Sequence, residues 1–95
     1  MTAYAIMDVE IFDIEQYMQF MQRVKPLIER SGGHYLARGG EFRVYEGDYE
    51  PRRLVLMEFP SLEEWDRFYH SEDYQLLKPL RDACSHSRLV AVSGT

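Results

Sequence analysis

Four ionisable side chains lie among apolar neighbours in segments expected to form strands, where they could support acid–base chemistry. Asp8 follows an apolar N-terminal run, and Glu58 closes another. His34 and Arg38 lie between two glycine pairs. An arginine can hold a substrate carboxylate or enolate, while a histidine or a carboxylate can transfer a proton. Arg38, Glu58 and His34 are therefore the candidate catalytic residues, and Asp8, Arg38 and Glu58 are candidate ligand-binding residues.

The same arginine also has a purely structural interpretation. An ionised group inside a protein is costly unless it is paired, so we expect Arg38 to pair with Glu58 on the neighbouring strand. That pair could merely fix strand register or subunit geometry, or Arg38 could clamp a ligand anion while Glu58 or His34 moves a proton. A carboxylate beside an arginine has a lowered pKa, which weakens Glu58 as a general base at neutral pH. Both interpretations stay open.

Other combinations of reactive side chains do not form a recognisable site. The three histidines, His34, His70 and His86, lack the spacing of metal ligands. Cys84 lies two residues from His86, and residues so close near a helix end do not face each other. The glycine pairs lack the lysine and serine that follow in a phosphate-binding loop. We therefore predict no metal and no cofactor.

Hydrophobic periodicity predicts the elements that must position these residues. Capping boxes start helical regions at Asp13 and Ser61, and a break with a new cap is expected at Ser71. Pro26 and Pro79 predict a kink or a restart within the helices. The expected strands are residues 3–11, one long strand over 34–46 with a bulge at Gly39-Gly40, 52–59 buried on both faces, and 88–93.

This order, β-α-β-β-α-β, predicts a ferredoxin-like α+β fold with helices on one face of a four-stranded antiparallel sheet. The usual strand order, 4-1-3-2, puts the two most apolar segments in the middle. Residues 1–95 are expected to form a single domain. The candidate ligand site is the sheet face away from the helices, where we expect Asp8, His34, Arg38 and Glu58, and the hydroxyls of Tyr69 and Tyr74 are candidates to cap a pocket.

Charge and composition exclude several classes of partner. The net charge of −5 argues against binding to nucleic acid or to an anionic membrane, since both require a basic surface. A single cysteine cannot form an internal disulfide, and no secretory leader or membrane-spanning run is recognisable. We therefore expect a cytoplasmic protein. A core this small is marginal, which favours a partner subunit.

The run Gly33-x-Tyr35-Leu36-Ala37-Arg38-Gly39-Gly40 identifies a resemblance to a known family. Together with Glu46-Gly47, Glu58-Phe59-Pro60-Ser61 and an arginine, Arg81, seven residues after Tyr74, it resembles domain-of-unknown-function family 1330 over essentially the whole chain. The resemblance implies a dimeric α+β barrel, in which two ferredoxin-like subunits join their open sheet faces as a homodimer. Relatives in that superfamily include small monooxygenases and isomerases, so the fold alone decides no chemistry. Tyr69, Tyr74 and Arg81 join the candidate ligand-binding residues.

Two functions remain open, and whether the protein is an enzyme is uncertain from the sequence. The protein could be a cofactor-less enzyme, isomerase or monooxygenase-like, that acts on a small organic acid in the sheet-face pocket. Alternatively, it could be a non-catalytic dimeric binding or regulatory module whose buried ion pair is structural. A ligand-sized cavity beside Arg38 would favour the enzyme, and a filled interior would favour the module.

Overall fold

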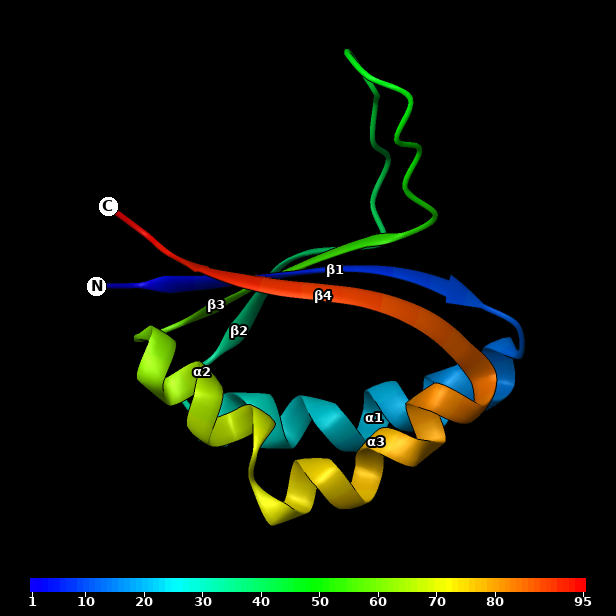
Figure 1. The fold of residues 1–95 in the computed structure, drawn as a ribbon. Coiled ribbons are helices and arrows are strands. Elements are labelled where there is room, and N and C mark those ends of the chain that lie inside the picture. The colour runs from blue at the N-terminus through cyan, green and yellow to red at the C-terminus, as the bar shows by residue number, and fades with distance from the viewer.

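The computed structural model describes residues 1–95 and contains four strands and three helices. The three helices cover one face of the sheet and leave the other face open (Figure 1). In chain order the elements are β1 (Ala3–Ile11), α1 (Ile14–Arg30), β2 (His34–Arg38), β3 (Leu54–Phe59), α2 (Leu62–Tyr69), α3 (Glu72–Cys84) and β4 (Ser85–Ser93). No helix combines the length and apolar character that crossing a membrane requires.

The strand order is β2-β3-β1-β4 and every pair is antiparallel, which confirms the predicted topology. β1 and β3 occupy the centre of the sheet, as their apolar sequences indicated. β4 begins at Ser85, three residues earlier than predicted, because the chain passes from α3 directly into a strand whose first residue pairs with Ile11.

One side of the sheet forms the core. Met7 and Val9 of β1, together with Val55 and Met57 of β3, point toward the helices and are buried. The alternate residues of β3 are only half-buried, so the prediction that residues 52–59 are buried on both faces is wrong. Burial alternates along β3 because the helices cover a single face of the sheet.

The helices begin at the predicted caps. Asp13 accepts a hydrogen bond from the backbone of Gln16 at 3.2 Å, and the Ser61 and Ser71 hydroxyls cap α2 and α3 in the same way. The break near Ser71 therefore separates two helices, as predicted. Pro26 and Pro79 lie within α1 and α3 without dividing either helix. Both prolines are exposed, so the carbonyl that each leaves unpaired can be solvated.

The long strand predicted over 34–46 does not form, because β2 ends at Arg38. Residues 39–53, hereafter the arm, have no regular secondary structure and project from the open side of the sheet (Figure 1). Gly39 makes the turn, with a φ of 71°, and its amide donates to the Leu54 carbonyl at 2.8 Å. Beyond that turn the chain has no neighbouring strand with which to form a ladder, so the strand stops.

Candidate functional site

A bulge within β2 decides which way Arg38 points. Tyr35 is opposite Met57, but Ala37 is opposite Leu56, so Leu36 is an extra residue in the ladder. A shift of one residue moves every later side chain to the other face. Arg38 is consequently opposite the buried Val55 and lies on the helix side of the sheet. The bulge was predicted at Gly39-Gly40, and its true position makes the predicted Arg38–Glu58 pair wrong.

Glu58 pairs instead with the directly opposite residue of β2. Its carboxylate is 2.8 Å from Nε2 of His34, which is the less buried member of the pair. Both side chains belong to the open face of the sheet. The sequence candidates Arg38, Glu58 and His34 are therefore divided between two faces, and no single ligand on one face can contact all three.

Asp8 also lies on the open face, at the base of the arm. Its carboxylate accepts hydrogen bonds from the Tyr49 hydroxyl at 2.5 Å and from the amides of Arg52 and Arg53 at 2.9 and 3.2 Å. Burial opposes ionisation, but these hydrogen bonds outweigh it and lower the pKa of Asp8. The lone pairs that a ligand would need are thus largely occupied by the arm.

A small cavity lies between the sheet and the helices. The volume open to the centre of a water-sized molecule is about 20 Å³, which is enough for about one water. Thirteen of its fifteen lining residues are hydrophobic, and the other two are Arg38 and Arg81. The hydrophobic lining residues include Met7, Tyr17, Val24, Tyr35, Val55, Met57, Trp65, Phe68 and Tyr74.

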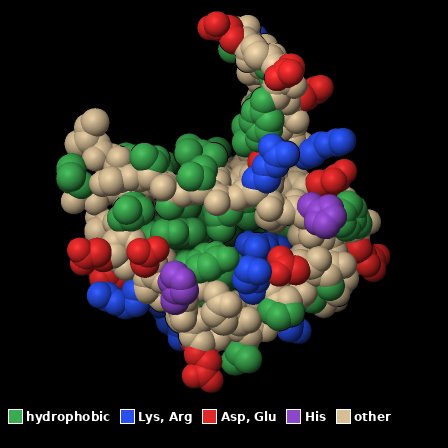
Figure 2. All heavy atoms as spheres, in the orientation of Figure 1, with side chains coloured by type: hydrophobic (Ala, Val, Ile, Leu, Met, Phe, Trp, Pro, Cys, Tyr) green, Lys and Arg blue, Asp and Glu red, His purple; other side chains and the backbone are tan.

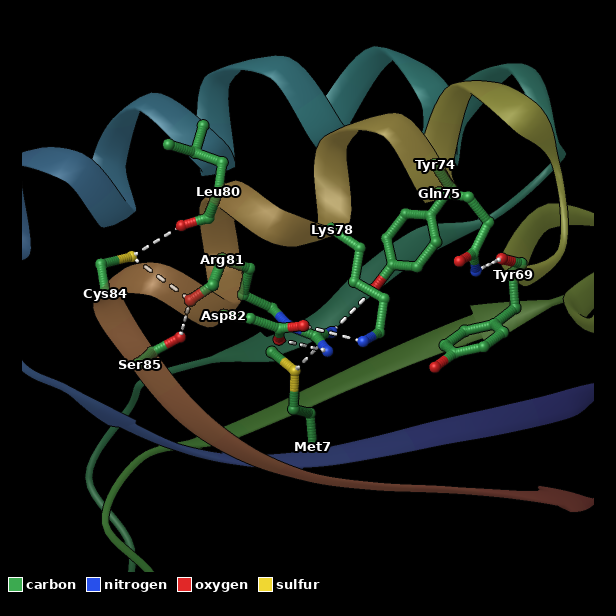
Figure 3. Close-up of polar contacts among 10 residues, drawn as sticks. All are labelled: Met7, Tyr69, Tyr74, Gln75, Lys78, Leu80, Arg81, Asp82, Cys84 and Ser85. Carbon is green, nitrogen blue, oxygen red and sulfur yellow. Dashed lines mark hydrogen bonds and ion pairs between the residues drawn. The ribbon is translucent and has the colours of Figure 1, made fainter.

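Arg81 is the charged group most deeply enclosed by the fold, with 5% of its surface exposed. Its Nη1 donates to the Tyr74 hydroxyl oxygen at 2.7 Å, across two helical turns of α3 (Figure 3). Its Nη2 reaches a carboxylate oxygen of Asp82 at 3.4 Å, but Asp82 is half-exposed and also accepts from Lys78 at 2.8 Å. The Nε of Arg81 is buried and has no hydrogen-bond partner.

Burial, opposed in part by the charge of Arg81, raises the pKa of Tyr74 to about 12. Tyr74 therefore stays protonated at neutral pH. Since its oxygen accepts from Arg81, its own proton is available to a second acceptor. Tyr69, the other predicted tyrosine, does not line the cavity and packs its ring against Tyr74 at 5.3 Å between centroids.

These side chains can bind an anion but cannot remove a proton. The lining contains no aspartate, glutamate, histidine, lysine or cysteine, and an arginine stays protonated at all relevant pH values. No group of three or more histidine, cysteine or acidic side chains is arranged to hold a metal ion.

The sequence analysis predicted a ligand site on the open face of the sheet, whereas the cavity lies on the helix side, and Tyr17, Tyr35 and Trp65 were not predicted to line it. Arg81 and Tyr74 were predicted through the family resemblance, and a second signal points to the same helix face: Arg81 shares the buried stripe of α3 with Tyr74 and Cys84. An arginine on the apolar side of a helix indicates a polar function within the core.

The fold places the protein among known α+β structures. A crystal structure of the RPA0582 protein of unknown function from Rhodopseudomonas palustris matches with a TM-score of 0.78, at 18% identity, over 99% of this chain and 82% of that one. A dimeric ferredoxin-like protein of unknown function from Jannaschia sp. CCS1 matches with a TM-score of 0.72, at 13% identity, over 99% and 100% of the two chains. SnoaB, a cofactor-independent oxygenase from Streptomyces nogalater, matches with a TM-score of 0.71, at 10% identity, over 98% of this chain and 92% of that one.

Topology and these likenesses define a ferredoxin-like α+β protein with relatives among dimeric α+β barrels. A comparison with curated protein sequences found no match. The chain belongs to the family described as Domain of unknown function (DUF1330), whose model matches residues 2–95. The resemblance noted in the sequence is thereby confirmed.

Proposed function

We propose that the protein binds a small organic acid in the cavity between sheet and helices and converts it without a cofactor, in the manner of a monooxygenase. The observation that carries this proposal is Arg81. Its guanidinium is buried beside an apolar cavity, its Nε has no partner, and its carboxylate neighbour is half-exposed and shared. An anionic ligand in the cavity would supply the missing charge and acceptor.

The energetics favour such a ligand. Taking a guanidinium out of water costs several kcal/mol (roughly,), and one hydrogen bond to Tyr74 recovers only part of that cost. A charge-assisted hydrogen bond from Arg81 to a ligand oxygen would contribute about 1.5–3 kcal/mol. The free proton of the Tyr74 hydroxyl could donate a second bond to the same group.

The chemistry of the lining favours an oxygenase over an isomerase. An isomerase needs a base beside the substrate, but the lining residues include none, and His34 and Glu58 lie on the opposite face of the sheet. A phenol or enol that is acidic enough can instead lose its proton to water and be held as its anion by Arg81 and Tyr74. Such an anion can give one electron to dioxygen and combine with the resulting superoxide at a ring carbon that bears hydrogen. The hydroperoxide then loses water, so one oxygen atom stays in a quinone-type product, the other leaves as water, and the substrate supplies both electrons. The similar fold of SnoaB, named as a cofactor-independent oxygenase, is compatible with this chemistry.

One observation favours a second candidate, a binding or regulatory module. The cavity has space for about one water, whereas ligand pockets usually measure about 300–1,000 Å³. Side chains must therefore move before a ligand enters, and a protein that only senses a ligand would also show such an opening.

Two measurements test the proposal. The single tryptophan, Trp65, lines the cavity, so titration with benzoate should change its fluorescence, and Arg81→Gln should abolish the change. An oxygen electrode should then record dioxygen consumption with an acidic phenol in the wild type but not in Arg81→Gln. Fluorescence changes without oxygen consumption across a panel of phenols and enols would favour the binding module. No fluorescence change with any organic acid would contradict both.

We further propose that the chain forms a homodimer through the open face of the sheet. Hydrophobic side chains gather along this face (Figure 2), among them Val90 and Val92, which are 60% and 51% exposed. The arm projects from the same side and exposes Phe42 and Val44. Light scattering should give about twice the chain mass of 11.3 kDa, and Val90→Glu should shift it to the monomer value. A wild-type mass equal to one chain at micromolar concentration would refute the dimer.

A further inference from the structure

Two more arginines flank the cavity on the helix side of the sheet. Arg38 lines the cavity, and its guanidinium carbon is 4.8 Å from the centroid of the Tyr35 ring. Arg53 precedes the buried Val55 by two residues and therefore points to the same side. Its guanidinium carbon is 5.9 Å from the ring centroid of Tyr17, another lining residue.

Neither arginine has an acidic partner. Four of the other arginines, Arg30, Arg43, Arg52 and Arg67, each form an ion pair. Arg38 and Arg53 form none, and neither do the exposed Arg23 and Arg88, which lie away from the cavity lining. The Nε of Arg53 is buried and lacks any hydrogen-bond partner. The chain has 16 acidic and 11 basic residues, so a shortage of carboxylates does not explain the unpaired arginines.

The start of the arm accommodates Arg53 closely. A Cβ on Gly39 would lie 2.6 Å from the guanidinium carbon of Arg53, so a side chain at this position would displace the guanidinium from its present place. The charges of Arg38 and Arg53 both act on the Tyr35 hydroxyl and oppose the effect of its burial on its pKa. Two cations held near one hydroxyl without a carboxylate repel each other, and a bound anion would relieve that repulsion.

We propose that Arg38 and Arg53 form a second anion site at the mouth of the cavity, and that the ligand carries two acidic groups separated by an apolar body. One acidic group binds Arg38 and Arg53, the other binds Arg81 and Tyr74, and the hydrophobic lining contacts the body between them. This inference rests on the proposed function, because it assumes that the inner group of the ligand occupies the site beside Arg81.

Matched aromatic acids test the inference. The probes are benzene-1,4-dicarboxylate, which has two acidic ends, and benzoate, which has one, each titrated against Trp65 fluorescence and by calorimetry. The diacid should bind the wild type at least about tenfold more tightly than benzoate, because a second charge-assisted contact contributes on that scale. Arg53→Gln and Arg38→Gln should each remove most of this preference. Arg53 does not line the cavity, so Arg53→Gln should also leave benzoate affinity within about twofold.

The control is Arg23→Gln, because Arg23 is exposed on α1 and forms no ion pair. This variant should keep the wild-type preference for the diacid. Arg53→Lys keeps the positive charge but lacks the planar, forked guanidinium, so the preference of this variant for the diacid should fall between those of the wild type and Arg53→Gln. Circular dichroism establishes that each variant is folded. If Arg53→Gln does not fold, Arg38→Gln tests the second anion site by itself, because Arg38 is exposed.

The outcomes separate the inference from the function on which it rests. If benzoate binds in an Arg81-dependent way but the diacid binds no more tightly, the second site is wrong and the proposed function stands. An unchanged diacid preference in both glutamine variants would also overturn the second site. If neither acid binds, both proposals fail.

Discussion

If Arg81 and Tyr74 exist to bind a ligand, replacing the pair with apolar side chains should not destabilise the fold. In the free protein Arg81 makes one short hydrogen bond, to Tyr74, and two longer contacts, to the Met7 sulfur at 4.0 Å and to a half-exposed carboxylate. Replacing a buried ionic group with apolar residues of similar volume is neutral or stabilising by about 1–4 kcal/mol. We therefore expect the double variant Arg81→Met/Tyr74→Phe to be at least as stable as the wild type.

The single variant should behave differently. Arg81→Met leaves the Tyr74 hydroxyl, on a side chain that is 3% exposed, without its partner. An unsatisfied buried hydroxyl costs about 1–3 kcal/mol, so the single variant should be less stable than the double variant by that amount. In a domain of this size the difference corresponds to a change in Tm of roughly 4–8 °C for each kcal/mol.

Urea unfolding followed by Trp65 fluorescence measures all three stabilities, and benzoate titration measures binding by the same variants. Both variants should lose benzoate binding, while the double variant should keep the wild-type stability. A double variant that is less stable than the wild type by more than about 2 kcal/mol would show that the pair stabilises the fold. That result would refute the argument that the buried arginine is retained for a ligand.

Three further predictions concern the arm, the glycine turn and the cysteine. The pKa of Asp8 is lower in the folded protein than its value of 3.8 in the unfolded chain. The ionised carboxylate therefore stabilises the fold above pH 3.8, and this stabilisation is lost as the pH falls through the folded pKa. Asp8→Asn should lower the Tm at pH 7 but much less at pH 3. Gly39→Ala should destabilise by about 1–2 kcal/mol in urea unfolding, because a φ of 71° is strained for alanine and its Cβ would meet Arg53. An effect below about 0.5 kcal/mol would mean that the turn relaxes freely. Burial raises the pKa of the Cys84 thiol, so a thiol reagent should label the protein at the rate of its opening, and immediate labelling of the folded protein would contradict the packing.

Local signals predicted the framework of the fold well. Asp13, Ser61 and Ser71 cap helices as their spacing indicated, because a cap depends on residues within one helical turn. Strand order also followed from composition, since the most apolar segments need the centre of the sheet. These properties depend on near neighbours or on the segment as a whole, so the sequence carries them directly.

The direction in which Arg38 points could not be predicted because it depends on strand register. Whether Arg38 points toward Glu58 or toward the helices is decided by a single extra residue at Leu36, and no local propensity marks that position. The length of β2 likewise depends on whether a neighbouring strand is present, which residues 40–46 cannot encode by themselves. Arg81 was predicted through the family resemblance, which includes its spacing from Tyr74, but its contact with Met7 of β1 depends on the tertiary fold.

The bulge in β2 has a consequence for how related proteins should be compared. Deleting Leu36 would restore a regular ladder and would leave Arg38 opposite Val55, on the cavity side. Keeping Leu36 but pairing it regularly with Leu56 would instead place Arg38 opposite Leu54, on the outer surface of the sheet. The same arginine at the same aligned position therefore points inward or outward according to whether the strand is bulged. Between relatives, a gap at Leu36 would preserve the inward cation, whereas an ungapped alignment without the bulge would change the chemistry of the cavity even where every aligned residue type is the same.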